Sequence, residues 1–307
     1  MRKHTILIIA ILLSVSANAF AASQLAPLFE TLKHVDYSDP MARIPERENF
    51  YAAISQEFLS KIVPSEEIPE IIRGIDSGNI LVRDAAMASA LGMIGYHRAD
   101  TAQNANRLVP PFLEVLDEFR AMIPTVTRHF GDTISDGRNP NILSDWTWKL
   151  VSVRFMDSVW VVPPPEMVSW MLEMVSDDSN EIVEILTHLD PLPSEVMHAL
   201  MRRSDAVKSD RDRGISLAIT FVQSLTDLKI LGRGKTQIQA DRTFNPELIE
   251  WLVQTALDKD APSLVRIRAI MAVAQLAPSL LPRLQELANS DIEEVVHTAN
   301  DVGLRKQ

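Results

Sequence analysis

Apolar residues recur three and four positions apart along most of the chain, and they seldom alternate with polar residues. This spacing gathers apolar side chains on one face of a helix, as in amphipathic α-helices. The best strand-like run, at 159–162, is short and stops at consecutive prolines. The pattern therefore predicts an all-α protein.

Prolines and capping residues divide this pattern into segments. Pro64, Pro165 and Pro246 each stand where a new helix would begin, because proline lacks the donor that a first turn leaves unpaired. The pattern then predicts helices at 23–35, 45–62, 65–77, 80–95, 106–130, 141–161, 165–176, 180–188, 194–204, 212–230, 246–258, 263–277, 279–289 and 291–304. Many short helices on short connections are typical of stacked helical hairpins.

The segments 80–95 and 263–277 share one pattern of apolar and small residues. On one helical face the first carries Val82, Ala86, Ser89, Ala90 and Met93, and the second carries Val265, Ala269, Ala272, Val273 and Leu276 at the same spacing. In both segments an arginine follows the first valine, and the small residues let neighbouring helices approach closely. A weaker third copy, with Val295, Ala299 and Val302, lacks this arginine.

Both segments resemble the second helix of a HEAT or HEAT-like repeat, and the third copy resembles a terminal cap. The resemblance covers residues 65–95 and 246–305. It implies an α-solenoid of stacked antiparallel helical hairpins, in which no single hairpin is stable alone. Residues 100–245 show helices without the repeat pattern, so they are either degenerate repeats or an inserted helical module.

The amino terminus has the three parts of a secretory signal peptide: a basic start, an apolar run at 6–15 and small residues up to Ala21. The apolar run is too short to cross a membrane, which takes roughly 20 residues. Peptidase cleavage is expected after Ala19 or Ala21. We therefore assign residues 1–21 to a cleaved signal peptide and expect the mature chain, 22–307, in the bacterial periplasm or secreted.

Charge and composition exclude several classes of partner and site. The formal net charge is −11, and loss of Arg2 and Lys3 with the signal peptide makes it more negative. This acidity disfavours nucleic acid and anionic membranes, whose phosphates require Lys and Arg. The chain has no cysteine, which excludes disulfides, thiolate nucleophiles and Cys-ligated metals. No charge-free apolar stretch of the mature chain approaches the length of a membrane span, so no stable membrane insertion is expected.

The sequence patterns of enzymes and cofactor sites fit this chain poorly. Residues 232–236 end like a phosphate-binding loop but lack its leading glycine. Asp132 and Asp136 imitate the start of a calcium loop, yet Ile134 and Leu143 stand where oxygen ligands are required. The histidines lack metal-ligand spacing. We therefore expect a non-enzymatic protein without cofactor or metal.

An alternative is an exported enzyme or small-molecule binder with its site in the helical middle region, residues 100–245. His129, His188 and His198 lie in this region together with the polar loop 131–141. This interpretation requires these groups to converge in one concave pocket.

The stretch 131–162 is the most distinctive part of the chain. Trp146 and Trp148, two positions apart on a helix, point about 200° from each other, so both cannot be buried on one face. An exposed tryptophan beside an arginine is typical of a binding hot spot. The candidate partner-binding residues are Asp132, Asp136, Arg138, Trp146 and Trp148. The alternative is that both rings pack between neighbouring hairpins.

The two repeat arginines are expected to hold adjacent hairpins in register. Their expected partners are acidic residues nearby: Asp76 or Asp84 for Arg83, and Asp258 or Asp260 for Arg266. Repeats of this kind build extended concave surfaces that bind other proteins. The expected function is therefore a non-enzymatic protein–protein interaction scaffold or adaptor in the bacterial periplasm.

Overall fold

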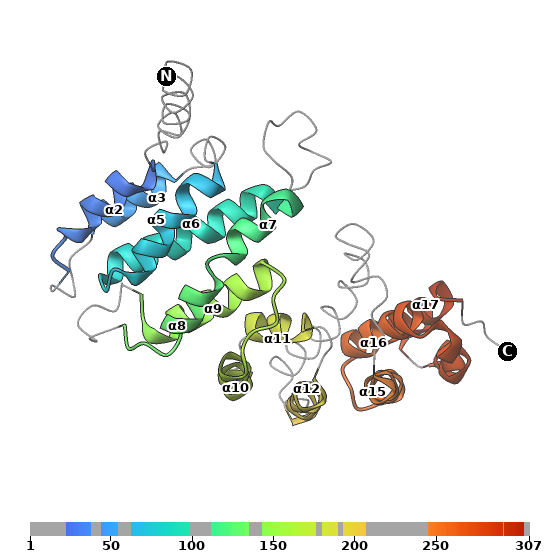
Figure 1. Ribbon diagram of the computed structural model, residues 1–307. Helices are drawn as coiled ribbons and strands as arrows, with labels where there is room; N and C mark the ends of the chain where they lie inside the picture. Colours follow the sequence, from blue (N-terminus) through green and yellow to red (C-terminus); the bar gives the residue numbers. More distant parts are fainter. Residues whose placement is uncertain are drawn as a thin grey trace, which may run out of the picture. The chain divides into compact units, whose positions relative to one another are not determined.

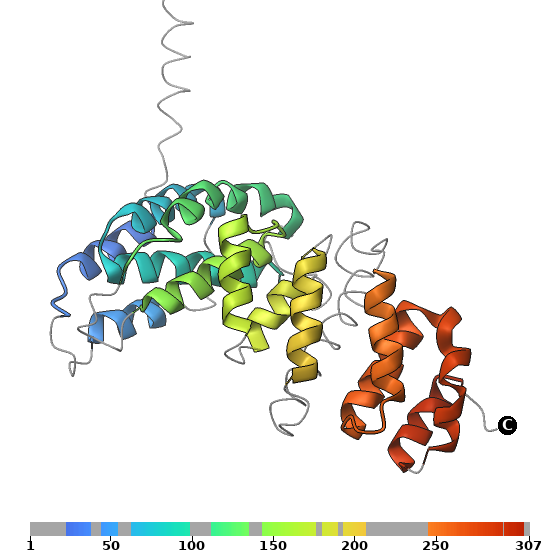
Figure 2. The same ribbon diagram turned by 90° about the horizontal axis from the view of Figure 1, so that it is seen from below.

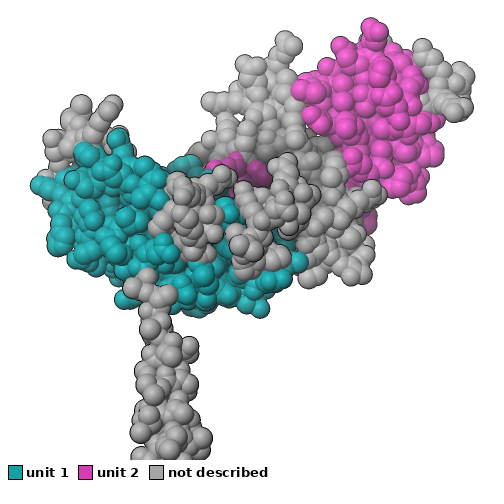
Figure 3. Space-filling model, turned by 90° about the horizontal axis from the view of Figure 1, so that it is seen from above, with its two compact units in different colours: residues 1–161 teal, residues 162–307 magenta. Residues whose placement is uncertain are grey.

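The computed structural model describes residues 23–37, 44–54, 63–98, 112–134, 143–175, 180–189, 193–206, 245–290 and 292–303. All regular structure in these residues is helical, in fourteen helices and without a strand. The prediction of an all-α protein is thereby confirmed. The chain divides into two compact units, residues 1–161 and residues 162–307 (Figure 3). None of the described helices combines the length and the apolar composition that a membrane span requires.

The helix bounds mostly lie within a few residues of the predicted ones. In unit 1 the described helices are α2 (Leu25–Lys33), α3 (Pro45–Ala53), α5 (Pro64–Asp76), α6 (Ile80–Arg98), α7 (Phe112–Arg120), α8 (Ile123–His129) and α9 (Asp145–Ser158). In unit 2 they are α10 (Pro165–Met174), α11 (Asn180–Thr187), α12 (Ser194–Ala206), α15 (Pro246–Leu257), α16 (Ser263–Leu276), the 3₁₀ helix η2 (Pro278–Asn289) and α17 (Glu293–Asp301).

The hairpin of α5 and α6 lies at the centre of unit 1. Helices α2 and α3 pack against it from one side, and α7, α8 and α9 pack against it from the other (Figures 1 and 2). Its turn is defined locally, because Gly78 adopts φ +65°, a conformation that glycine enters without strain. The Asn79 Oδ1 atom then accepts hydrogen bonds from the backbone N–H groups of Leu81 and Val82, at 3.0 and 3.1 Å, and so caps α6.

The shared sequence pattern forms the buried face of both second helices, as predicted. The buried residues are Val82, Ala86, Ser89, Ala90 and Met93 in α6, and Val265, Ala269, Ala272 and Val273 in α16. Leu276 is partly buried against the same core. In the third copy Val295 and Ala299 are buried, and Val302 packs against them. These pattern residues supply five of the twelve buried residues in the core of α15, α16, η2 and α17.

One predicted helix, 106–130, is two helices in its described part. Helix α7 ends at Arg120, and α8 begins at Ile123. Pro124 explains the break, since it has no N–H to donate to the carbonyl of Arg120, four residues earlier.

The predicted helix at 279–289 is a 3₁₀ helix, η2, with Pro282 in its interior. Proline removes a helical donor and restricts the residue before it, which favours the tighter, irregular winding. The predicted helix at 212–230 and the signal peptide at 1–21 lie outside the described residues.

Candidate functional site

Hydrogen bonds fix the start of α9, the helix that carries both candidate tryptophans. The Ser144 hydroxyl accepts the backbone N–H of Thr147 at 3.1 Å and forms the N-cap. The Asp145 carboxylate accepts the backbone N–H of Ile134 at 2.7 Å. These contacts tie the loop after α8 to the first turn of α9.

The two tryptophans face opposite environments, as their spacing predicts. Trp148 is 0% exposed, and its indole N–H donates to the backbone carbonyl of His129 at 2.7 Å. The Arg83 guanidinium lies 5.5 Å from the centroid of the Trp148 ring. Trp146, in contrast, is 46% exposed. The interpretation that both rings pack between hairpins is therefore wrong, and so is the assignment of Trp148 to a partner surface.

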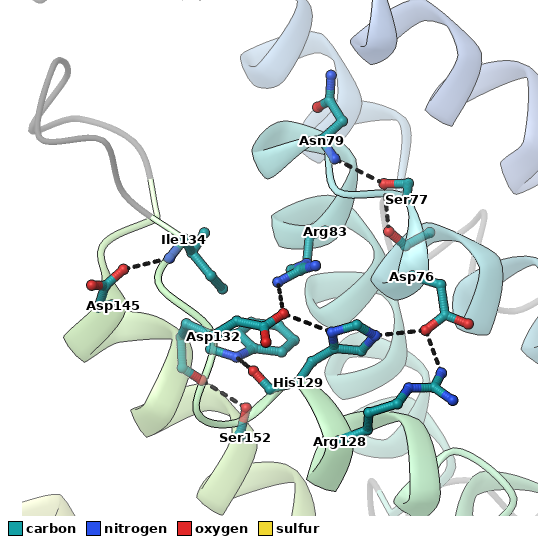
Figure 4. A network of polar contacts seen from close by, with 12 residues as sticks. Asp76, Ser77, Asn79, Arg83, Arg128, His129, Asp132, Ile134, Asp145 and Ser152 are labelled. Carbon is teal, nitrogen blue, oxygen red and sulfur yellow. Dashed lines mark hydrogen bonds and ion pairs between the residues drawn. The ribbon is translucent and has the colours of Figure 1, made fainter.

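A chain of ionic contacts connects α6, α8 and the end of α5 (Figure 4). The Asp132 carboxylate accepts from Arg83 Nη1 at 2.9 Å and lies 2.7 Å from His129 Nδ1. The Asp76 carboxylate accepts from Arg128 at 2.6 Å and lies 2.8 Å from His129 Nε2. We call these five residues the Arg83–Arg128 network.

The Arg83–Arg128 network provides a carboxylate partner for the buried guanidinium of Arg83. The Arg83 side chain is only 8% exposed, whereas its partner Asp132 is 39% exposed. A buried guanidinium needs a carboxylate to offset its loss of hydration. Since Arg83 belongs to α6 and Asp132 follows α8, the pair fastens successive helical pairs of unit 1 together.

The cations of the network stabilise the ionised form of both aspartates. Burial acts to raise the pKa of Asp76, but hydrogen bonds from Arg128 and His129 outweigh it, and the pKa lies below its ordinary value. Burial likewise opposes the shift at Asp132, where His129 and Arg83 lower the pKa. Both carboxylates are therefore charged near neutral pH.

His129 is poorly placed to act as a general base. Each of its ring nitrogens lies within hydrogen-bonding distance of an aspartate oxygen, and only the imidazolium form donates from both. A general base needs a free ring nitrogen facing its substrate. The geometry of the Arg83–Arg128 network is that of a structural clamp.

The predicted partners of the two repeat arginines were wrong in both hairpins. Arg83 pairs with Asp132, and Arg266 Nε donates to the backbone carbonyl of Ala256 at 3.1 Å. Asp84 instead accepts from Arg47 at 3.2 Å and from the Tyr51 hydroxyl at 2.8 Å. Asp76 belongs to the Arg83–Arg128 network, where it contacts Arg128 and His129. The Arg83–Asp132 pair connects α6 to the residues that follow α8. The Arg266 contact lies within the hairpin of α15 and α16, so it does not hold adjacent hairpins in register as expected.

Of the five candidate partner-binding residues, Trp146 is the one whose described side chain is substantially exposed and forms no hydrogen bond or ion pair. Asp132 is held in the Arg83–Arg128 network, and Trp148 is in the core. Asp136 and Arg138 lie outside the described residues. No sequence pattern indicated that Asp76 and Arg128, 52 residues apart, would form an ion pair.

His129 and His198, two of the three histidines of the alternative interpretation, have different partners. His129 belongs to the Arg83–Arg128 network of unit 1. In unit 2, His198 Nε2 lies 2.9 Å from a carboxylate oxygen of Glu247, which joins α12 to the start of α15. In the part of the chain that the structure describes, no group of three or more histidine, aspartate or glutamate side chains is arranged to hold a metal ion.

Comparisons of the chain with protein-family profiles, with curated proteins and with solved structures found no match.

Proposed function

We propose that this protein is a HEAT-like α-solenoid that acts as a protein–protein interaction scaffold or adaptor in the bacterial periplasm. The solenoid is supported by two hairpins, α5–α6 and α15–α16, whose second helices bury the same pattern of residues. Both second helices also bury an arginine that bonds to a neighbouring element. Such recurrence is what a stack of equivalent hairpins requires.

The observation that carries the proposed function is the exposure of Trp146. Tryptophan is the largest apolar side chain, and water-exposed tryptophans held in place are enriched at the centres of protein interfaces. Trp146 is 46% exposed, whereas Trp148, two positions further on, is completely buried. The helix that bears both therefore directs one indole into the core and the other into solvent.

The surroundings of Trp146 are ordered before any partner binds. Its helix is capped by Ser144, and its neighbour Asp145 is bonded to Ile134. Trp148, two positions after Trp146, anchors the same helix through the hydrogen bond from its indole N–H to the His129 carbonyl. A contact residue on a fixed helix loses little conformational entropy on binding, which favours affinity.

Affinity capture of the mature protein from periplasm tests this proposal. The Trp146→Ala variant should lose a stoichiometric protein partner that the wild type retains, because truncating a central tryptophan typically costs at least about 2 kcal/mol, or roughly 30-fold in Kd. Leu113→Ala is the matched control, since Leu113 is 56% exposed on α7 in the same unit. Equal recovery of the partner with both variants would contradict the assignment of Trp146.

A further inference from the structure

Helix α9 ends in a turn where glycine is usual, but Trp160 occupies the glycine position. Trp160 has φ +55°, a left-handed conformation that a bulky side chain adopts only at a steric cost. Its backbone N–H donates to the carbonyl of Asp157 at 3.1 Å, and the N–H of Val161 donates to that of Met156 at 3.0 Å. These two bonds form the Schellman pattern of helix termination. A tryptophan held there against its backbone preference points to a role for its side chain.

Helix α7 holds this turn in place. The Arg120 Nε atom donates to the carbonyl of Val159 at 3.2 Å. The Trp160 ring meets the Phe112 ring edge-on, with 5.1 Å between the ring centroids. The Trp160 indole is therefore ordered, although it remains partly exposed to solvent.

Arg98, at the end of α6, lies against the same phenylalanine. Its guanidinium carbon is 5.7 Å from the centroid of the Phe112 ring. Burial lowers the pKa of Arg98, and attraction to Asp157 only partly opposes this shift. In the described part of the chain, nothing accepts a hydrogen bond from its N–H groups. Arg98 thus differs from Arg83, which donates to a carboxylate.

A guanidinium that is stacked on an aromatic ring and lacks a hydrogen-bonded carboxylate is suited to bind a carboxylate from outside. Its planar N–H groups match the two oxygens of a carboxylate, and partial burial strengthens the attraction between the charges. Arg98 and Trp160 are both partly exposed, and both contact the Phe112 ring. One ligand can therefore reach the guanidinium and the indole together.

We propose that Arg98, Phe112 and Trp160 bind the carboxyl-terminal residue of a protein partner, with its α-carboxylate on Arg98 and its apolar side chain against Trp160. A terminal residue carries the charge and the apolar group on one carbon atom, which suits two contacts grouped around one ring. An internal acidic residue would need a second residue for the apolar contact. The site lies beyond the end of α9, about 20 Å along the helix axis from Trp146, so it is a second contact surface and goes beyond the proposed function.

NMR titration of the mature protein with N-acetyl-phenylalanine tests the proposal. The amide of this probe has the same shape without the charge and is the control. The indole N–H signal of Trp160, assigned by its loss in Trp160→Phe, should shift saturably with the acid. The amide should bind at least about tenfold more weakly, because it lacks the charged hydrogen bonds to Arg98. Equal shifts with acid and amide, or no shift with either, would overturn the proposal without bearing on Trp146.

Substitution of Arg98 tests which group binds the carboxylate. Arg98→Gln should weaken binding of the acid at least about tenfold and leave binding of the amide unchanged. Arg73→Gln is the matched control, because it removes the same charge from an exposed arginine of unit 1 that pairs with Glu70. An equal loss of binding in both variants would contradict the site, since it would reflect net charge alone.

Melting temperatures distinguish this binding role from a structural one. Because Arg98 has no hydrogen-bonded carboxylate among the described residues, Arg98→Gln should change the melting temperature by less than about 2 °C. A larger drop would indicate a structural ion pair with Asp157 and would contradict the proposal. Trp160→Gly should melt higher than Trp160→Ala, since both lose the indole and only glycine enters the left-handed conformation without strain. The reverse order would refute the strain at Trp160.

Discussion

Gly74 offers a quantitative test of how closely the central hairpin packs. A Cβ atom built at Gly74 would lie 2.8 Å from Cβ of Ala86 on α6 and 3.1 Å from Cε2 of Phe29 on α2. Favourable carbon–carbon contacts are about 3.5–4.0 Å. The Cβ of Ala86 cannot rotate away, so Gly74→Ala must push the helices apart, which typically costs about 1–3 kcal/mol.

Gly95 on α6 provides the matched control, since a Cβ there would have no atom within 4 Å. Replacing a helical glycine by alanine gains up to about 1 kcal/mol from helix propensity at either position. Gly95→Ala should therefore stabilise the protein by up to about 1 kcal/mol, whereas Gly74→Ala should range from neutral to destabilising by about 2 kcal/mol once the full propensity gain is subtracted. The two variants differ by the steric cost alone.

Urea denaturation followed by circular dichroism measures both effects as shifts of the midpoint at constant slope. A second substitution, Ala86→Gly, should relieve the clash in the Gly74→Ala background, and a double-mutant cycle would report this as a favourable coupling. If Gly74→Ala and Gly95→Ala stabilised the protein equally, the described contact between α5 and α6 would be refuted.

Three further predictions concern α9 and the Arg83–Arg128 network. Trp148→Ala should lower the free energy of unfolding by about 3–5 kcal/mol, whereas Trp146→Ala should change it by less than about 0.5 kcal/mol; chemical denaturation separates the two. Asp132→Ala leaves the Arg83 guanidinium buried without its carboxylate and should lower the free energy of unfolding by about 1–3 kcal/mol. An unchanged denaturation midpoint would contradict the ion pair between Arg83 and Asp132. The pKa of Asp76 is lowered in the folded state, so the ionised carboxylate stabilises the fold. This stabilisation is fully present above the ordinary aspartate pKa near 4, and it is lost as the pH falls through the lower pKa of the folded state. The melting-temperature difference between wild type and Asp76→Asn should therefore be full at pH 6 and shrink towards pH 2, and a difference that grew on acidification would have the wrong sign.

The helices and their buried faces could be predicted from the sequence because they follow from local periodicity. The buried positions of α6 and α16 repeat at helical spacing, and any helix with that pattern has one apolar face. The opposite orientations of Trp146 and Trp148 follow from the same geometry. The break between α7 and α8 was missed because the helical periodicity of 106–130 outweighed the signal of a single proline, Pro124.

The ionic contacts could not be predicted, because they depend on which helices become neighbours in space. Proximity in the sequence favoured Asp76 or Asp84 as the partner of Arg83. Asp84 is adjacent to Arg83 on α6, and adjacent residues on a helix point in different directions. The actual partner, Asp132, is 49 residues away. Glu67 shows the same limit. A glutamate in a first turn ordinarily suggests only an interaction with its own helix, but the Glu67 carboxylate accepts the backbone N–H of Gln24 at 2.7 Å, at the start of α2.

The proposed function requires Trp146 to lie on the surface that binds a protein partner. The most direct measurement is photo-crosslinking in the intact periplasm, with a photoreactive phenylalanine analogue at position 146 and, as control, at position 113. If Trp146 contacts the partner, position 146 should give an adduct of one defined mass, and position 113 should give none of that mass. No adduct from position 146, or the same adduct from both positions, would contradict it.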